Sequence, residues 1–396
     1  MVVTGKYTDL RYQSGDAQNG VVSISIDRGY EVGSGTGTLL WNGQAILTAA
    51  HVVGSHAKTI TITTETESGK RSYQASNWLV HPEYDSVNVT NDLAIIWLGS
   101  SVNPDVVRSD LYRDSDEIGH QFSMVGYGDV GNGATGKVAN INQLRLMADN
   151  TFDVSGEGLM GSPYIRLNWT PINTLFADFD NGLSANDAFG RLIYEADTGL
   201  GENEGLIASG DSGGPAFIGT KIAGVASYNA ALRKSTINPD IDSNPLNSSF
   251  GEVAAWQRVS SFQEWIDQSM RANYLNAPTK PSEVVSTVSE GNSGTTYIYF
   301  MVEFNGLRDM NSIVSVDYET RDGSAIAGLD YLAISGTLNI YSNEDWALIP
   351  VEIIGDNFAE PDETFSLAIF NPVGGTFGGP IELVATRTIL NDDGLL

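Results

Sequence analysis

Short apolar runs that alternate with polar residues recur through most of this chain, and they restrict it to a mainly β fold. Residues 21–26, 59–63 and 93–98 are examples, and Gly, Asn and Ser separate such runs between residues 20 and 130. A period of two places the apolar side chains on one face of a strand. We therefore expect antiparallel sheet here, while the less regular residues 140–205 have the composition of an insertion.

The hydrophobic period changes near residue 258, where the sequence predicts a helix. Val259, Phe262, Ile266 and Met270 recur at helical spacing, so RVSSFQEWIDQSM is expected to form an amphipathic helix. The segment NAPTKPSE that follows at residues 276–283 contains two prolines and has no apolar periodicity. This composition is typical of a linker.

Strand alternation returns after this linker. Apolar residues at every second position predict three strand faces: Thr296, Ile298, Phe300, Val302 and Phe304; Val314, Val316 and Tyr318; Phe365, Leu367 and Ile369. Several strands without helical periods predict a β-sandwich. A chain of 396 residues is also too long for one ordinary core, so we expect domains at 1–275 and 284–396 on either side of a 276–283 linker.

The charge and cysteine content of the chain exclude several classes of function. Lys and Arg number 21 and Asp and Glu number 49, which gives a formal net charge of −28. Such a surface repels phosphate backbones and anionic lipids, so we expect no nucleic-acid partner. The absence of cysteine excludes disulfides, cysteine-based zinc sites and thiol nucleophiles. No stretch resembles a membrane span or a signal peptide, so a secreted form is expected to carry its signal outside this chain.

The segment GDSGGP at residues 210–215 carries the strongest chemical signal. A serine hydroxyl becomes a useful nucleophile when a base takes its proton and preorganised donors bind the oxyanion. Glycines around Ser212 allow the backbone to turn so that two N–H groups point at one spot. An ordinary turn is the alternative, but LTAAHVV supplies His51 and TNDLAIIWL supplies Asp92, in a chain order known for catalytic triads. The other histidines lack such a context and are expected to be structural: His56, His81 and His120.

Together LTAAH, NDLAII and GDSGGP resemble the trypsin-like serine proteases. The segments VHPEYD, GYG and IAGVASY and the helix around Trp265 agree with that family. The resemblance covers about residues 3–272 and implies two six-stranded β-barrels with the active site between them. It also implies a secreted endopeptidase that acts on proteins or peptides and needs no cofactor for its chemistry.

The resemblance assigns a role to each matched residue. Ser212 attacks the scissile carbonyl, His51 accepts and later returns the proton, and Asp92 orients the imidazole. The backbone N–H groups of Gly210 and Ser212 would form the oxyanion hole. The 120 residues between Asp92 and Ser212 exceed the usual spacing, which favours an insertion within residues 140–205.

The resemblance also predicts the residues of the substrate pocket. Ser227 is expected beneath Asp92, Tyr228 at the entrance of the pocket, and Leu206 at its base. An acidic residue at that base would select Arg or Lys, so Leu206 favours an apolar P1 residue. Asn229 stands where a glycine is usual and is expected to narrow the pocket. Three glutamates remain alternative sources of charge if the loops differ: Glu202, Glu204 and Glu252.

The start of the chain weakly resembles the start of a mature enzyme of this family. Removal of Met1 or of a longer leader would free the amine of Val2, which we expect to insert and pair with Asp211. The alternative is a site that forms without insertion, with Asp211 held by internal hydrogen bonds.

The C-terminal segments VSEGNSGTTYIYF, YETRDGSAIAGLDY, GDNFAEPDETF and TRTILNDD are similar to Calx-beta domains over about residues 280–396. This similarity implies an immunoglobulin-like β-sandwich that binds Ca²⁺ at one end. The positions that match the family's ligands are Glu290, Asp330, Asp356, Glu360, Asp392 and Asp393. Gly355 and Asn391 stand where acidic residues are common, and a calcium-free spacer with solvated acids is the alternative.

The leading interpretation is therefore a secreted serine endopeptidase with a calcium-binding accessory domain. The competing interpretation is a non-catalytic adhesin or matrix-binding protein that retains a relic protease fold. The complete set of His51, Asp92 and Ser212 with its glycine loop favours the enzyme.

Overall fold

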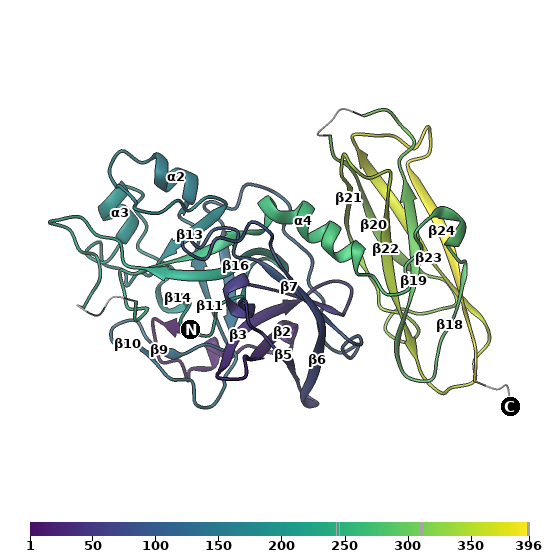
Figure 1. Ribbon diagram of the computed structural model, residues 1–396, viewed down its shortest axis with the longest axis horizontal. Helices are drawn as coiled ribbons and strands as arrows, with labels where there is room; N and C mark the ends of the chain where they lie inside the picture. The colour runs from purple at the N-terminus through teal and green to yellow at the C-terminus, as the bar shows by residue number, and fades with distance from the viewer. Residues whose placement is uncertain (243, 245, 309–311, 394–396) are drawn as a thin grey trace. The chain divides into compact units, whose positions relative to one another are not determined.

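The computed structural model describes residues 1–242, 244, 246–308 and 312–393 and contains two compact units (Figure 1). The first consists of residues 1–40, 44–100 and 106–263, and the second of residues 41–43, 101–105 and 264 onward. The division falls within helix α4 (Val259–Ala272), before the boundary expected at residue 275. Each unit has its own core, as the two blocks of strand alternation predict.

The N-terminal half of the first unit is a closed barrel of six strands in the order β2-β3-β4-β7-β6-β5. These strands are β2 (Val21–Asp27), β3 (Val32–Leu39), β4 (Ala45–Thr48), β5 (Thr59–Thr66), β6 (Gly69–Val80) and β7 (Ala94–Leu98). In β2, Ile24 and Ile26 are buried while Ser25 and Asp27 are exposed, as a period of two requires. The three strands expected from the sequence are confirmed.

The second half of the first unit forms a seven-stranded sheet in the order β11-β8-β15-β16-β17-β13-β12. Its strands are β8 (Gln121–Gly126), β11 (Leu146–Thr151), β12 (Val154–Ser155), β13 (Thr174–Asp178), β15 (Pro215–Ile218), β16 (Lys221–Ala230) and β17 (Val253–Arg258). The two edge strands β11 and β12 are separated only by Phe152 and Asp153, so one bent chain segment runs from one edge to the other. The two edges are joined by the chain and not by strand pairing, so this sheet is a seven-stranded half-barrel rather than the closed six-stranded barrel expected from the resemblance; we call it the second barrel.

Three aromatic side chains fill the centre of this second barrel. Phe122 stacks on Phe152 with ring centroids 4.0 Å apart, and Trp256 meets Phe122 edge-on at 4.9 Å. All three are almost fully buried. Aromatic rings bury large areas, so this cluster anchors the strands that carry the C-terminal half of the site.

A small four-stranded sheet lies beside the second barrel in the order β10-β9-β1-β14. Its strands are β1 (Val2–Val3), β9 (Val130–Asn132), β10 (Gly136–Val138) and β14 (Gly205–Leu206). Short helices connect the strands of this unit: α1 (Ala50–Val53), α2 (Gly156–Gly161), α3 (Ala188–Ile193) and the 3₁₀ turns Leu10–Tyr12, Asp16–Gln18 and Gly201–Asn203. The predicted helix is confirmed as α4, where Val259, Phe262, Ile266 and Met270 are all buried.

The second unit is a β-sandwich, as expected. One sheet has five strands in the order β18-β24-β23-β20-β21, and the other pairs β19 with β22. The strands are β18 (Thr287–Ser289), β19 (Gly294–Glu303), β20 (Val314–Asp322), β21 (Ser335–Ile340), β22 (Trp346–Gly355), β23 (Glu363–Val373) and β24 (Glu382–Leu390), and a 3₁₀ turn spans Pro281–Glu283. The three predicted faces supply its core, although Thr296, Val302 and Phe304 are only partly buried. None of the helices in the described part of the chain is long and apolar enough to cross a membrane.

Candidate active site

Strand pairing in the first barrel brings His51 and Asp92 together. The last residue of β4, Thr48, pairs with the first residue of β7, Ala94, so the segments just beyond these two residues meet at one end of the barrel. His51 is the second residue of α1, and the preceding Ala49 has no side chain that can cap the helix. Asp92 takes over this role, since its Oδ1 accepts the N–H of His51 at 2.8 Å.

The carboxylate of Asp92 is fully buried and makes three hydrogen bonds. Besides the His51 N–H it accepts from His51 Nδ1 at 2.7 Å and from Ser227 Oγ at 2.5 Å. A carboxylate oxygen accepts, so the ring proton lies on Nδ1 and Nε2 is left as an acceptor. His51 itself is half-buried, which leaves its ring accessible to a substrate.

Ser227 reaches Asp92 because of an irregularity in β16. The register between β16 and β17 shifts between Ala226 and Tyr228, so Ser227 is the extra residue of a bulge. Bulges redirect a side chain out of the regular pleat. The structure thus places Ser227 against Asp92, where the family resemblance put it.

The loop that carries Ser212 is held tightly by its own backbone and by the first barrel. Gly214 donates to the Asp211 carbonyl at 2.8 Å, and Thr36 donates to the Ser212 carbonyl at 2.9 Å. Gly213 adopts a φ of +83°, and a Cβ there would clash with Thr48 and with the carbonyl oxygen of Thr36. Glycine is therefore required at this position, because it alone allows the loop to lie against the strand that leads to His51.

Two backbone donors beside the nucleophile are free. Within the described residues, the N–H groups of Gly210 and Ser212 make no hydrogen bond, and none joins His51 to Ser212. Gly210 has a φ of +95°, a conformation that favours glycine. Free donors next to a serine are what an oxyanion hole requires.

The N-terminal amine pairs with Asp211, but it belongs to Met1 and not to Val2. The Met1 amine lies 2.7 Å from Asp211 Oδ2 and also donates to the carbonyl of Asp129. The expectation that removal of Met1 frees the Val2 amine for Asp211 stays a prediction, because this chain retains Met1. Here β1 pairs with both β14 and β9, which places Val2 opposite Leu206.

Internal hydrogen bonds also hold Asp211. Its Oδ1 accepts from Gly128 N and its Oδ2 from Ala208 N, both at 2.8 Å. Features of both alternatives raised by the sequence are therefore present. An inserted amine supplies the positive charge beside Asp211, and backbone N–H groups supply the remaining hydrogen bonds to its carboxylate. Both the amine and the carboxylate are buried, so the pair is shielded from solvent.

The predicted pocket residues occupy two neighbouring backbone segments. Leu206 is fully buried in β14. The Tyr228 hydroxyl accepts from Trp169 Nε1 at 3.2 Å, and burial raises the pKa of Tyr228 to about 12. The Asn229 amide donates to the Ile207 carbonyl at 2.8 Å and to Ser248 Oγ at 3.0 Å. Asn229 thereby links the segment before the catalytic loop to a loop on the other side.

The three glutamates considered as alternative pocket charges all have other partners. Glu202 is exposed and pairs with Arg11 at 2.6 Å. The carboxylate of Glu204 accepts the N–H groups of Asp180 and Leu200, both at 2.6 Å. Fully buried Glu252 accepts the N–H groups of Asn247 and Ser248 at 3.0 and 3.1 Å, and burial raises its pKa.

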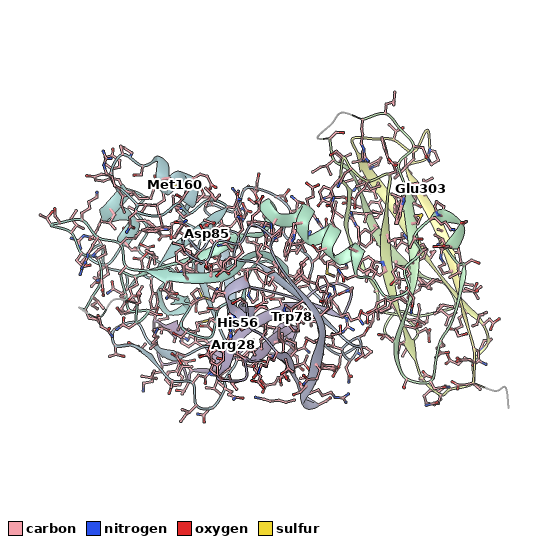
Figure 2. The ribbon with its side chains drawn as sticks, viewed as in Figure 1. Arg28, His56, Trp78, Asp85, Met160 and Glu303 are labelled. Atoms are coloured by element: carbon pink, nitrogen blue, oxygen red, sulfur yellow. The ribbon has the colours of Figure 1, made fainter. Side chains whose placement is uncertain are left out.

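The remaining histidines have structural contacts. His56, labelled in Figure 2, is exposed and forms a hydrogen bond with Ser55. His81 packs edge-on against Phe262 at 5.4 Å, and His120 faces Asp116. None of these contacts resembles the His51 and Asp92 pair.

A second group of acidic residues gathers at one end of the β-sandwich. β18 and β24 run parallel and end together, and the start of β23 pairs with the end of β24. Glu290, Asp356 and Asp393 follow the ends of β18, β22 and β24 respectively. Loop residues Asp330 and Glu360 join Glu363 there, and one carboxylate oxygen of each lies within 4.8 Å of the others.

Two parts of the chain match known domain families. Residues 12–162 match the trypsin family, and residues 282–393 match the Calx-beta domain. The chain has a trypsin-like serine protease fold followed by a Calx-beta domain. Both resemblances drawn from the sequence are confirmed. We call the first compact unit the protease domain and residues 282–393 the Calx-beta domain.

Individual proteins and one solved structure are similar to parts of this chain. A chymotrypsin of Phaedon cochleariae is 26% identical over 228 residues, which are 56% of this chain and 67% of that protein. The sodium/calcium exchanger Calx of Drosophila melanogaster is 38% identical over 85 residues, which are 22% of this chain and only 9% of the exchanger. The solved structure of HL collagenase is 16% identical with a TM-score of 0.47, and the match covers 65% of this chain and 96% of that one.

The acidic end of the Calx-beta domain has the donors that a hard cation prefers. Burial raises the pKa of Glu363 to about 7, and neighbouring Asp330 adds repulsion. Asp393 Oδ2 is buried without a hydrogen-bond partner in the described residues. All donors are oxygen atoms, which fits Ca²⁺. Of the predicted ligands, Asp392 is exposed and accepts the Gly291 N–H at 3.2 Å.

Sequence reasoning missed Glu363 as a member of this group. It begins β23 within the segment PDETF and is not among the positions that match the family's ligands. The signal that identifies it is its position: as the first residue of a strand that starts at the acidic end, its side chain belongs with the loop acids.

Proposed function

We propose that this protein is a secreted serine endopeptidase whose catalytic residues are His51, Asp92 and Ser212. The observation that carries the proposal is the fully buried Asp92, whose carboxylate holds His51 Nδ1 at 2.7 Å and leaves Nε2 free to act as a base. The proposed protease region is residues 1–275, joined through 276–283 to a domain at 284–396. Proteins or peptides are the proposed substrates.

The reaction proposed for these residues has two halves. Ser212 Oγ attacks the scissile carbonyl carbon while His51 Nε2 takes the hydroxyl proton, and the N–H groups of Gly210 and Ser212 donate to the oxyanion. Collapse of the tetrahedral intermediate breaks the C–N bond, and His51 returns the proton to the leaving amine. Water then attacks the acyl-enzyme with His51 as base, which releases the acid and restores Ser212. Asp92 stabilises the imidazolium in both halves.

An active-site-directed fluorophosphonate probe tests this proposal against a relic fold. We expect the probe to label Ser212, because its phosphorus is attacked by an activated serine hydroxyl. Ser212→Ala should abolish the labelling, and peptide mapping should place the adduct at Ser212. An unlabelled but folded wild-type protein would favour the adhesin or matrix-binding alternative.

We predict that the enzyme prefers an apolar P1 residue. Leu206 is apolar, and Glu202, Glu204 and Glu252 are engaged elsewhere. Burying a cation without a partner is unfavourable, so kcat/KM for Leu, Phe, Tyr or Met at P1 should exceed that for Arg or Lys by about tenfold or more. A peptide-library cleavage profile measures this. Dominant cleavage after Arg or Lys would contradict it.

Asn229 provides a matched test of pocket size. Its amide links Ile207 to Ser248, so Asn229→Gly should remove the link and favour the larger Phe and Tyr over Leu. The same cleavage profile reads out the change. An unaltered ratio of Phe to Leu cleavage would place Asn229 outside the P1 pocket.

We further propose that the Calx-beta domain binds Ca²⁺ at its acidic end. Glu290, Asp330, Asp356, Glu360, Asp392 and Asp393 are the proposed ligands, and the structure adds Glu363 to them. The bound ion would supply positive charge that offsets the mutual repulsion of these carboxylates. The chemistry at Ser212 would not involve it.

Chelation should lower the melting temperature of this domain. An ion that binds only the folded state adds about 2.7 kcal/mol at a hundred times its Kd. Differential scanning calorimetry with excess chelator or millimolar Ca²⁺ measures the effect, and in the double variant Asp330→Ala with Asp393→Ala the unfolding transition of this domain should not respond. Glu303→Gln is the control. Glu303, labelled in Figure 2, is exposed and ends β19, whereas Gly294 begins this strand near the acidic end, so the variant should keep the Ca²⁺-dependent shift in melting temperature. An unchanged calorimetric trace would leave the domain a spacer.

A further inference from the structure

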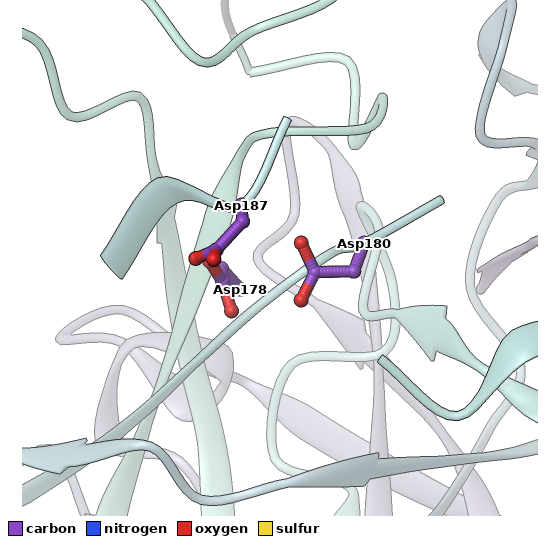
Figure 3. Close-up of side chains that lie close together, drawn as sticks. All are labelled: Asp178, Asp180 and Asp187. Carbon is purple, nitrogen blue, oxygen red and sulfur yellow. The ribbon is translucent and has the colours of Figure 1, made fainter. Parts of the chain in front are cut away.

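A second cluster of carboxylates lies in the protease domain, well outside the proposed catalytic residues. Asp178 ends β13, Asp180 follows two residues later, and Asp187 caps the start of α3. One oxygen of each lies within 4.8 Å of the others, and all three residues are at most 3% exposed. Figure 3 shows the three carboxylates facing one another across the loop.

Backbone donors satisfy two members of this cluster but not the third. Asp178 Oδ2 accepts Phe189 N at 2.9 Å, and Asp187 Oδ1 accepts Gly190 N at 2.5 Å. Asp180 Oδ1 is buried with no hydrogen-bond partner among the described residues. The Asp180 side chain is directed toward the other two carboxylates (Figure 3). A buried and unpartnered carboxylate oxygen costs free energy unless a ligand meets it.

The part of the chain that the structure describes pairs no positive charge with this cluster. Within the described residues, no Lys, Arg or His forms an ion pair with any of the three aspartates. The ionisable neighbours of the cluster are also acidic. Glu204 and Asp153 add negative charge beside Asp180, and Asp153 forms a hydrogen bond with Asp178. Burial, reinforced by these neighbours, raises the pKa of Asp180 to about 10.

We propose that Asp178, Asp180 and Asp187 bind a hard divalent cation, Ca²⁺, in the protease domain. The donors are oxygen atoms throughout, which suits Ca²⁺ rather than a metal that prefers nitrogen or sulfur. This site is separate from the acidic end of the Calx-beta domain, and it does not depend on the proposed peptidase activity.

The bound cation would fasten the segment that leads to the catalytic loop. Glu204 accepts the Asp180 N–H through its side chain and the Thr4 N–H through its carbonyl at 3.0 Å. β14 follows at once and pairs with β1, which positions the Met1 amine. A cation at Asp180 therefore stabilises the same backbone that carries Leu206 and Asp211, and its role is structural.

Calcium binding by the full chain tests the proposal once the Calx-beta ligands are removed. In a background of Asp330→Asn with Glu363→Gln, equilibrium dialysis with radioactive Ca²⁺ at pH 7.5 should find one bound ion in the protease domain. Adding Asp180→Asn should weaken that binding by about tenfold or more, because affinity depends on ligand charge. Glu195→Gln removes an exposed charge from the same connection and should leave binding unchanged.

Thermal unfolding provides a second measurement that does not need the Asp180 variant. The background protein should melt at a higher temperature in millimolar Ca²⁺ than in chelator, and Mg²⁺ should substitute poorly because it demands a smaller octahedral shell. A background protein that binds no Ca²⁺ and melts identically in both would show that protons neutralise the cluster. Equal Ca²⁺ affinity with and without Asp180→Asn, in folded proteins, would equally overturn the site.

Discussion

Replacing Ser212 with alanine should lower kcat by about 10⁴-fold or more while leaving the fold intact. The substitution removes the proposed nucleophile but not the contacts of its loop, since the Ser212 carbonyl still accepts the Thr36 N–H. His51→Ala should have an effect of similar size, because without the imidazole nothing takes the hydroxyl proton. Steady-state hydrolysis of a peptide ester measures both.

His56→Ala is the matched control for His51→Ala. His56 lies just beyond α1 and is exposed, so its removal should change kcat little. Circular dichroism should show that all three variants keep the wild-type fold. Near-normal turnover by purified Ser212→Ala or His51→Ala would reject the catalytic assignment.

Removing the buried charge pair at the N-terminus should have the next largest effect. Asp211→Asn, or acetylation of the Met1 amine, is expected to lower kcat by about 10²-fold or more, the size of the loss of one oxyanion donor. Asp211 is adjacent to both Gly210 and Ser212, and its carboxylate holds Gly128 and Ala208 in place. Without the Met1 amine, the buried Asp211 charge is uncompensated and the loop should rearrange.

A chain extended by one glycine before Met1 separates the effect of the position of the N-terminal amine from the effect of its charge. It retains a free amine but moves it by one residue, so its activity should also fall. Asp129→Asn is the control, because the contact of Asp129 with the amine uses only its backbone carbonyl. Equal activity of the free, blocked and extended chains would show that the loop forms without the inserted amine.

Features that depend on neighbouring residues could be predicted from the sequence. The alternation along 296–304, 314–318 and 365–369 predicted buried strand faces, since side-chain direction in a strand follows position parity. The helix at Val259–Ala272 followed from apolar spacing in the same way. The segments around His51, Asp92 and Ser212 are short continuous motifs, so the sequence predicted their roles without information on their geometry.

Tertiary structure alone decided how distant segments meet. The register of β1 between β14 and β9 brings the Met1 amine to Asp211. A bulge at Ser227 set its contact with Asp92, and the bend at residues 152–153 joined the two edge strands of the second barrel.

The two acidic clusters show the same limit. The family resemblance supplied most of the proposed Calx-beta ligands, but Glu363 joined them only because β23 begins at the end of β24. Asp178, Asp180 and Asp187 carry no motif, and a loop buries them together. The sequence by itself determined strands, helix and catalytic motifs, because these depend on local periodicity and composition. Strand register, bulges and loop paths depend on packing of the whole chain, so only the folded protein decided which charges face one another.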